Sequence, residues 1–389
     1  MKWEIAKLGD ISKNIQTGPF GSQLHQSDYS ECGIPVVMPK DLVGGKISEE
    51  SIARVDKTHV ERLCRHKIEV GDILYSRRGD VGRCAHVTKK EEGWLCGTGC
   101  LRVTIDSEKA DSRFVFFQLQ HPDTVGWVEK HAVGATMLNL NTTILSSVPI
   151  RLPTLEIQKR IADILSAYDD LIENNQKQIK LLEEAAQRLY KEWFVDLRFP
   201  GHENMKIVDG VPEGWRISSI YDVFDIKYGK NLPTSKITKV GQYPVYGASG
   251  VIGYYNEKNC DDYVTLVTSR GNGSGDVRRT HHKQSYVTNN SFIARRNDKN
   301  IFIKNEFTFQ LFSNTDFKKL CTGSAQPQLT NTSIQKIKIL LPNRQLIEKY
   351  QRCTIEMSEK QEALYKEQRA LTQARNRLLS KLINGTVEV

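Results

Sequence analysis

The sequence predicts an α+β protein in which two similar α/β domains are separated by two long antiparallel helices that pair as a coiled coil, with approximate two-fold symmetry. Two observations support this prediction: one globular stretch of the chain repeats at constant offsets, and a helical seam of apolar residues follows each copy. The predicted order is a domain over residues 1–152, a helix over 153–198, a second domain over 199–341 and a second helix over 342–389.

Length and composition are those of a globular protein. The 389 residues suffice for two or three domains with their own cores. A hydrophobic content of 39%, a charged content of 26% and a mean hydropathy of −0.46 exclude the disordered and membrane classes. No apolar run approaches the roughly 18 residues of a membrane-spanning helix, and residues 1–4 begin no signal peptide. We therefore expect a cytoplasmic protein.

The first domain contains a ten-residue motif that occurs again in the second. The sequence GATMLNLNTT, residues 134–143, returns as GSAQPQLTNT, residues 323–332. One offset, 189 residues, aligns the two copies without a gap and continues as far as Pro153 and Pro342. Solenoid repeats run roughly 20–50 residues, so this pattern indicates a duplicated domain instead.

The beginnings of the two domains also align. An offset of 212 residues pairs Trp3 with Trp215 and Asp10 with Asp222. This offset exceeds that of the motif because the second domain is shorter than the first.

The first long helix has a clear coiled-coil seam. Its apolar positions step by alternating threes and fours, which is the coiled-coil spacing. They are Leu165, Tyr168, Ile172, Ile179, Leu182, Ala186, Leu189 and Trp193. Asn175 interrupts the seam, and a seam asparagine commonly fixes register at some cost in stability.

The second long helix has a weaker seam. Met357, Leu364, Leu371 and Leu378 recur every seven residues, while the other column contains Gln361, Gln368 and Arg375. Each helix of about 40 residues would be about 60 Å long. An apolar stripe of that length must be buried, and the slightly acidic first helix complements the slightly basic second one. We expect an antiparallel pair; the alternative is that each helix packs separately on its own domain.

Catalytic and metal-binding motifs are absent from the sequence. It contains no G-x-x-x-x-G-K-[ST] loop, no G-x-S-x-G elbow and no H-E-x-x-H helix. The eight cysteines are scattered, and Cys96-x-x-x-Cys100 lacks the second pair that a four-cysteine zinc site requires. We predict free thiols, no metal site and no catalytic residue.

Glycine-rich loops with polar side chains are the candidate binding elements, and they too are doubled. Arg77-Arg78-Gly79 and Ser269-Arg270-Gly271 each follow an apolar run, so an arginine at a tight turn could approach a phosphate or a guanine edge. The alternative is an ordinary hairpin with a solvated arginine. The net charge of +9 modestly favours a polyanionic partner. The candidate DNA-contacting residues are Ser22, Gln23, Lys40, Arg77, Arg78, Thr136, Asn139, Lys230, Ser249, Arg270, Asn272, Ser274, Gln326 and Gln328.

Taken together, these features resemble the specificity subunits of type I restriction–modification enzymes, over essentially the whole chain. The resemblance is carried by Trp3 and Trp215 at the domain starts, the paired glycine motifs, and three further stretches. These are Thr17-Gly18-Pro19-Phe20-Gly21-Ser22, Tyr243-Pro244-Val245-Tyr246-Gly247, and a helix that begins near Leu152-Pro153-Thr154-Leu155-Glu156 and ends near Tyr190-Lys191-Glu192-Trp193-Phe194. The start of the second helix, Leu341-Pro342-Asn343-Arg344-Gln345, departs from the usual glutamine placement.

The resemblance implies a division of labour. Each domain would be a target recognition domain that reads one part of a split double-stranded DNA sequence, and the helices would set the distance between the parts. Two modification subunits would dock on the chain and methylate adenine at N6 with S-adenosylmethionine, and restriction subunits would join them. The chain itself would bind no cofactor. Because the two domains differ in sequence, their half-sites should differ, so the target should be asymmetric and interrupted.

Two other functions stay open at this point. The chain could be a nuclease or methyltransferase with an unrecognised site, or a protein-binding adaptor whose long helices are the functional surface. An enzyme would show turnover by the chain alone. An adaptor would show a DNA affinity that does not fall as the salt concentration rises.

Overall fold

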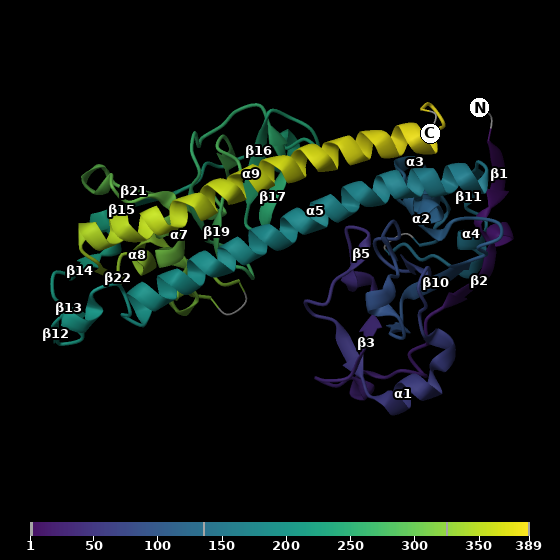
Figure 1. Ribbon diagram of the computed structural model, residues 1–389, viewed down its shortest axis with the longest axis horizontal. Coiled ribbons are helices and arrows are strands. Elements are labelled where there is room, and N and C mark those ends of the chain that lie inside the picture. The colour runs from purple at the N-terminus through teal and green to yellow at the C-terminus, as the bar shows by residue number, and fades with distance from the viewer. Residues whose placement is uncertain (1–2, 135–136, 324–325, 388–389) are drawn as a thin grey trace. The chain divides into compact units, whose positions relative to one another are not determined.

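The computed structural model describes residues 3–134, 137–323 and 326–387. The chain divides into two compact units: unit 1 is Met1–Glu173 with Arg369–Val389, and unit 2 is Asn174–Gln368. The two longest helices, α5 (Leu155–Tyr190) and α9 (Arg344–Ile383), contribute residues to both units (Figure 1). Each unit therefore consists of one α/β domain and a part of each long helix.

Unit 1 contains a four-stranded antiparallel sheet in the order β2-β10-β7-β8 and a three-stranded mixed sheet in the order β6-β3-β9. Its helices are α1 (Lys57–Arg62), α2 (Ser112–Gln120), α3 (Pro122–His131) and α4 (Thr142–Ser146). Its strands are β1 (Glu4–Lys7), β2 (Ser12–Thr17), β3 (Ile34–Val37), β4 (Leu42–Val43), β5 (Lys46–Ile47), β6 (Ala53–Val55), β7 (Ile73–Ser76), β8 (Cys84–His86), β9 (Leu95–Cys96), β10 (Cys100–Ile105) and β11 (Pro149–Leu152).

Unit 2 repeats this topology, with a four-stranded sheet in the order β15-β21-β18-β19 and a three-stranded mixed sheet in the order β17-β16-β20. Its helices are α6 (Ile220–Val223), α7 (Asn305–Ser313) and α8 (Asn331–Ile334). Its strands are β12 (Ile207–Val208), β13 (Val211–Pro212), β14 (Arg216–Ser219), β15 (Phe224–Tyr228), β16 (Tyr243–Gly247), β17 (Gly250–Tyr255), β18 (Thr265–Thr268), β19 (Val277–Arg279), β20 (Tyr286–Val287), β21 (Ser291–Arg296) and β22 (Lys338–Leu341).

The pairing registers agree with the two sequence offsets. The first and last strands of each domain pair with each other in antiparallel fashion, β1 with β11 and β14 with β22. Glu4 lies opposite Leu152 in unit 1, and Arg216 lies opposite Leu341 in unit 2. Glu4 and Arg216 are 212 residues apart, and Leu152 and Leu341 are 189 apart. The duplication in the sequence is therefore a duplication of the fold.

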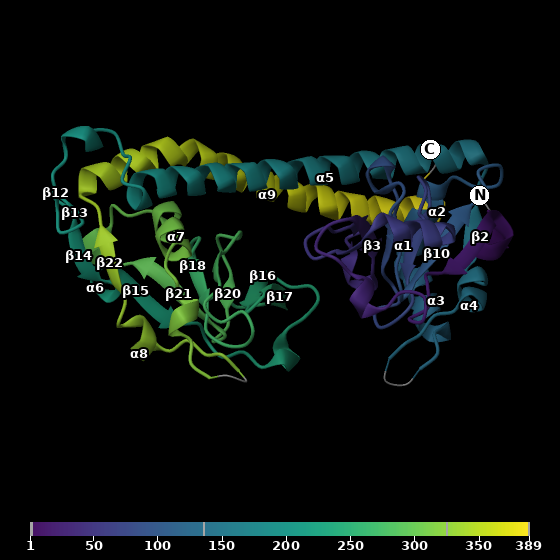
Figure 2. The same cartoon turned by 90° about the horizontal axis from the view of Figure 1, so that it is seen from below.

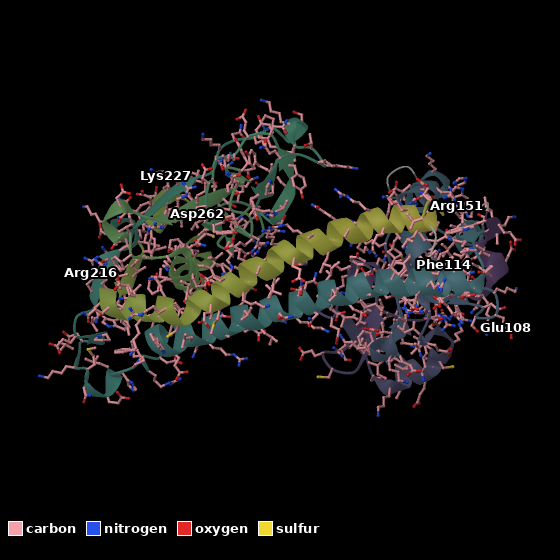
Figure 3. The ribbon with its side chains drawn as sticks, turned by 45° about the horizontal axis from the view of Figure 1, so that its top comes forward. Glu108, Phe114, Arg151, Arg216, Lys227 and Asp262 are labelled. Carbon is pink, nitrogen blue, oxygen red and sulfur yellow. The ribbon has the colours of Figure 1, made fainter. Side chains whose placement is uncertain are left out.

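The core of unit 1 joins the domain to both long helices. The side chain of Asp111 accepts hydrogen bonds from the N–H groups of Arg113 and Phe114 (3.0 and 3.1 Å) and so caps α2. Phe114 and Phe117 of α2 are buried, and Figure 3 labels Phe114 beside the helices. The same cluster contains residues of both helices, namely Ile161, Ala162 and Leu165 of α5 and Leu379, Leu382 and Ile383 of α9.

The core of unit 2 is rich in aromatic rings. Helix α5 ends in a π-helical turn, Lys191–Val195, which buries both Trp193 and Phe194. The ring of Phe194 lies 5.4 Å from that of Phe307 on α7 and 5.2 Å from that of Tyr350 on α9. Phe199, the first residue of the predicted second domain, is part of this core: it is only 3% exposed, and its ring centroid lies 5.5 Å from that of Trp215. Aromatic packing therefore fixes the entrance to the second domain.

The two long helices are antiparallel where they pair. In unit 2, the hydroxyl of Tyr350 donates to the carbonyl of Ala186 (3.2 Å), and the amide of Gln361 donates to the carbonyl of Ile179 (3.5 Å). In unit 1, Arg375 forms an ion pair with Asp169 (3.1 Å). Of the expected seam residues, Leu165, Ile179 and Leu364 are buried, and Ile172, Leu182, Leu189, Met357, Leu371 and Leu378 are half-buried. The polar column of α9 is equally involved, because Gln361 is buried as well.

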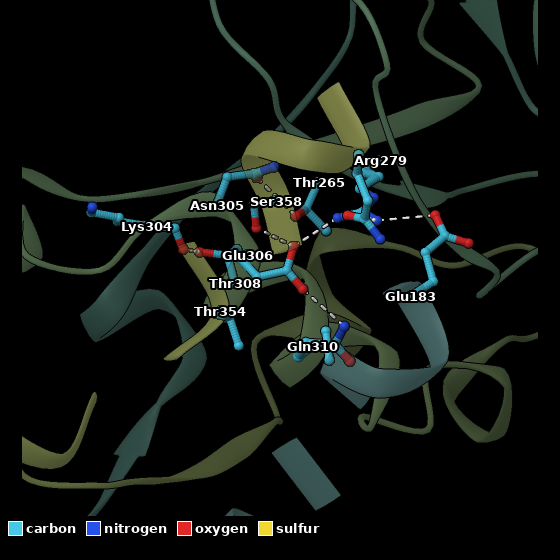
Figure 4. A network of polar contacts seen from close by, with 12 residues as sticks. Glu183, Thr265, Arg279, Lys304, Asn305, Glu306, Thr308, Gln310, Thr354 and Ser358 are labelled. Atoms are coloured by element: carbon cyan, nitrogen blue, oxygen red, sulfur yellow. Dashed lines mark hydrogen bonds and ion pairs between the residues drawn. The ribbon is translucent and has the colours of Figure 1, made fainter. Parts of the chain in front are cut away.

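A buried ion-pair network ties the second domain to both helices within unit 2 (Figure 4). The side chain of Arg279, 10% exposed, lies 2.7 Å from Glu306 of α7 and 3.0 Å from Glu183 of α5. It also donates a hydrogen bond of 2.9 Å to Gln361 of α9. One guanidinium therefore connects strand β19 to three helices.

The helices in the described ranges include none long and apolar enough to cross a membrane. All eight cysteines are free thiols. Burial raises the pKa of Cys96, and likewise of Cys84, to about 12, so these thiols are packed core groups.

Candidate nucleic-acid interface

The doubled motif and the doubled arginine loop meet in each domain. In unit 1 the N–H of Leu140 donates to the carbonyl of Arg77 (2.8 Å), and the N–H of Gly79 donates to that of Leu138 (3.0 Å). The N–H of Arg77 in turn donates to the carbonyl of Gly99 (2.8 Å). These bonds join segments 77–79, 97–100, 133–134 and 137–140 into one surface, which we name loop edge 1.

Unit 2 contains the same set of bonds. The N–H of Leu329 donates to the carbonyl of Ser269 (2.9 Å), and the N–H of Gly271 donates to that of Pro327 (3.2 Å). The N–H of Ser269 donates to the carbonyl of Asn290 (2.8 Å). Segments 269–271, 288–291, 322–323 and 326–329 therefore form loop edge 2, with the same bonding pattern as loop edge 1.

Each loop edge lies away from the long helices of its own unit. Loop edge 1 leads directly into α4 and loop edge 2 into α8. In Figure 2, α4 and α8 each lie on the side of their domain opposite to α5 and α9. A ligand on a loop edge would therefore approach that domain from the side that the helices do not cover.

Two glycines in each loop edge have backbone conformations that other residues rarely adopt. Gly79 and Gly271 have φ values of 75° and 89°, and Gly134 and Gly323 have 128° and 94°. A Cβ on Gly134 would also lie only 2.2 Å from the carbonyl oxygen of Met137. The doubled glycines therefore shape the loops, and the side chains between them are free to differ.

Several predicted contact residues lie on the loop edges. Arg78 and Asn139 are exposed and pair through their main chains in an isolated antiparallel β-bridge in unit 1. Arg270 and Gln328 form the equivalent β-bridge in unit 2. In the described part of the chain, neither Arg78 nor Arg270 makes an ion pair or hydrogen bond with its guanidinium. Both guanidinium groups are therefore available to an anionic or hydrogen-bonding ligand. Asn272 and Gln326 are also exposed.

Other predicted residues border the loop edges. Ser22 is exposed, whereas the side-chain oxygen of Gln23 accepts a hydrogen bond from the N–H of Phe20 (3.1 Å). Lys40 is exposed but donates to the carbonyl of Ser51 (2.7 Å). Ser249 lies in the turn between β16 and β17, where its carbonyl accepts from Arg278 (2.8 Å).

Lys230 is exposed just after β15, and its N–H donates to the carbonyl of Val287 in β20 (3.0 Å). Thr136 lies outside the described residues.

Two predicted contact residues, Ser274 and Arg77, are buried or half-buried. Ser274 is 5% exposed, and its hydroxyl donates to the carbonyl of Pro327 (2.6 Å). This bond pins the glycine loop to the doubled motif, so the placement of Ser274 on the DNA-contacting surface is corrected. Arg77 is half-buried, and its Nε is buried without a hydrogen-bond partner among the described residues.

Loop edge 2 also presents a pair of amides that were not among the predicted contact residues. Asn289 and Asn290 form the tip of a turn in which the N–H of Ser291 donates to the carbonyl of Thr288 (3.2 Å). The equivalent tip on loop edge 1 is Thr98 and Gly99, closed by the N–H of Cys100 and the carbonyl of Gly97 (3.2 Å). An Asn-Asn pair between two short apolar strands is a turn signal that could have revealed this element.

Two ionisable side chains beside the loop edges have raised pKa values. Burial raises the pKa of Tyr75, which precedes the arginine loop, so its hydroxyl stays protonated. Beside loop edge 2, the hydrogen bond that Lys318 donates to the carboxylate of Asp276 raises the pKa of Lys318, which keeps its charge. Across the three described ranges, no group of three histidine, cysteine or acidic side chains is placed to hold a metal ion.

Comparisons with known proteins agree with the duplicated fold. The family model described as "Type I restriction modification DNA specificity domain" matches residues 1–184 and 212–376. The type I restriction enzyme MjaIX specificity subunit of Methanocaldococcus jannaschii is 24% identical, over 100% of this chain and 94% of its own. The HindI specificity subunit of Haemophilus influenzae is 23% identical, over 99% of both chains. The crystal structure of a type I restriction–modification S subunit from M. genitalium has a TM-score of 0.60 at 20% identity, over 98% of this chain and 96% of its own.

Proposed function

Because the chain belongs to the family of type I restriction modification DNA specificity domains, we propose that it is the DNA-reading subunit of a type I restriction–modification complex. Each domain reads one half of an interrupted, asymmetric target through its loop edge. The observation that carries this proposal is the pair of loop edges, which share one backbone frame but differ in most of their exposed side chains. A shared frame with different side chains suits two readers of different sequences.

The chemistry of the complex is assigned to partners. Two modification subunits bind this chain, use S-adenosylmethionine and methylate adenine at N6, and restriction subunits cleave DNA. The chain itself supplies no catalytic residue and no cofactor site. Mixing the isolated chain with DNA, magnesium and S-adenosylmethionine tests this assignment, because turnover by the chain alone would contradict it.

Exchange of one domain tests the reading function. Residues 1–150 are replaced with the corresponding domain of another specificity subunit, and methylated adenines are mapped by single-molecule sequencing after co-expression with the modification subunits. The expected result is a target in which one half-site changes and the other is retained. A change in both half-sites, or in neither, would exclude independent reading by the two domains.

A further inference from the structure

At the turns that form the tips of the two loop edges, the main-chain bonds are equivalent but the side chains differ. The turn at Thr98 and Gly99 in unit 1 and the turn at Asn289 and Asn290 in unit 2 are closed by equivalent bonds of 3.2 Å. Main-chain bonds close both turns, and in unit 1 the hydroxyl of Thr98 adds a bond to the carbonyl of Pro19 (2.9 Å). Unit 2 therefore has two amides where unit 1 has a hydroxyl and no side chain.

The asparagine turn is held rigidly beside Arg270. Ser269 is fully buried, and its hydroxyl donates to the carbonyl of Asn289 (3.2 Å) while its N–H donates to that of Asn290 (2.8 Å). These bonds occupy the main-chain carbonyls of the two asparagines. Asn289 and Asn290 are half-buried, and their side-chain amides make no hydrogen bond within the described chain. The main chain of the turn is thus preorganised, and the two amides remain available as donors and acceptors.

An asparagine amide matches the major-groove edge of adenine. Its oxygen accepts from the N6 amino group while its NH₂ donates to N7, which no other base offers in that order. We propose that Asn289 and Asn290 are specificity-determining residues of the second domain, whose amides recognise an adenine in the second half-site. The inference rests on the proposed function and deepens it. Arg270 and Gln328, bridged beside the turn, add a guanidinium and a third amide to the same edge.

Loop edge 1 lacks this chemistry at the equivalent positions. Val133 and Met137 are 64% and 63% exposed, whereas their counterparts in unit 2 are the polar residues Thr322 and Gln326. Exposed apolar side chains can contact the methyl group of thymine but cannot form the amide pair with adenine. The difference between the edges thus predicts that changes at Asn289 and Asn290 affect only the second half-site.

The test uses the full chain co-expressed with its modification subunits in cells without other adenine methylation, and maps methylated adenines by single-molecule sequencing. The variants are N289A, N290A and the double variant N289T/N290G, which copies the tip of loop edge 1. Asn204→Ala is the control, because Asn204 is an exposed asparagine in the turn that follows Phe199. DNA affinity for target and single-mismatch duplexes is measured in parallel.

The expected result is a loss of about 10-fold or more in discrimination at one adenine of the second half-site. The first half-site and the control remain unchanged. Full discrimination in all three variants would overturn the inference, as would a uniform loss of affinity for every duplex, which would indicate a phosphate contact or a structural role. A wild-type complex that methylates no interrupted site would overturn the proposed function itself.

Discussion

Arg78 and Arg270 occupy equivalent positions on the two loop edges, and each has a guanidinium free for a ligand. We expect Arg78→Ala and Arg270→Ala to weaken DNA binding by about 1–3 kcal/mol. If the arginine reads guanine, the loss is confined to the cognate base at one position. If it contacts a phosphate, the affinity for all DNA sequences falls evenly. Titration of cognate and single-mismatch duplexes at fixed salt separates the two cases, and unchanged affinity in both variants would exclude a contact. Lys13→Ala, an exposed cation of β2, is the control.

The loss of Arg279 should destabilise unit 2. Replacement of Arg279 by methionine removes the ion-pair partner of Glu306, whose side chain is only 10% exposed. Breaking a buried pair in this way costs about 3–5 kcal/mol. Urea unfolding should show this loss, whereas Arg188→Met, which removes an exposed pair with Glu184, should cost less than about 1 kcal/mol. Equal effects of the two substitutions would contradict the structural role of Arg279.

His66 gives unit 1 a predictable response to acid. Burial, followed by the neighbouring charges of Arg65 and Arg102, lowers the pKa of His66 to about 4 from its ordinary 6.5. Between these two values the unfolded chain binds a proton that the folded chain does not. The free energy of unfolding should therefore fall as pH decreases from about 6.5 to about 4, by up to about 3 kcal/mol from this residue.

Urea unfolding across this pH range tests the effect of His66. The variant His66→Gln should show a shallower fall, while His131→Gln, at an exposed position, should follow the wild type. A His66→Gln profile with the wild-type slope would exclude His66 as the source. His86, whose pKa burial also lowers to about 4, should account for part of the remaining slope.

At the scale of elements, the seam of α5 contains one destabilising residue. Asn175 is 4% exposed, and its Nδ2 has no hydrogen-bond partner in the described part of the chain. Asn175→Leu should raise the free energy of unfolding by about 1–3 kcal/mol, because an unsatisfied buried amide is removed. Asn174→Leu changes helix propensity equally at an exposed position, so it is the matched control in the same urea titration. A smaller gain at Asn175 than at Asn174 would show that the asparagine is satisfied.

The elements differ in how far the sequence reveals them. The heptad spacing and the two offsets predicted both long helices and the duplication, because these depend on local periodicity and on self-comparison. The antiparallel direction followed from connectivity, since the second domain lies between the two helices in the chain. The polar seam of α9 was undervalued because Gln361 is stabilised by Ile179 and Arg279, partners distant in the sequence. The same reason explains Ser274, whose hydroxyl meets a carbonyl 53 residues later. The Asn-Asn pair could have revealed the turn at Asn289, but not its position beside Arg270, because that position depends on sheet order.

At the scale of the whole molecule, the net charge of +9 and the two loop edges predict salt-dependent DNA binding. Six phosphate contacts would reduce affinity about 1000-fold between about 50 and 200 mM salt, because counterions are released. Fluorescence anisotropy with a labelled duplex measures this dependence. An affinity that does not change with salt would instead favour the adaptor function, in which the long helices bind a protein.

The pairing of each domain's first and last strands has a wider consequence. Since β1 lies against β11 and β14 against β22, the chain leaves each domain beside the point where it enters. The two ends of each domain are adjacent in space. An exchange of gene segments could therefore replace one domain without changing the path of the rest of the chain. Large shifts in recognition could then arise by recombination, and small ones by point changes at the turn tips.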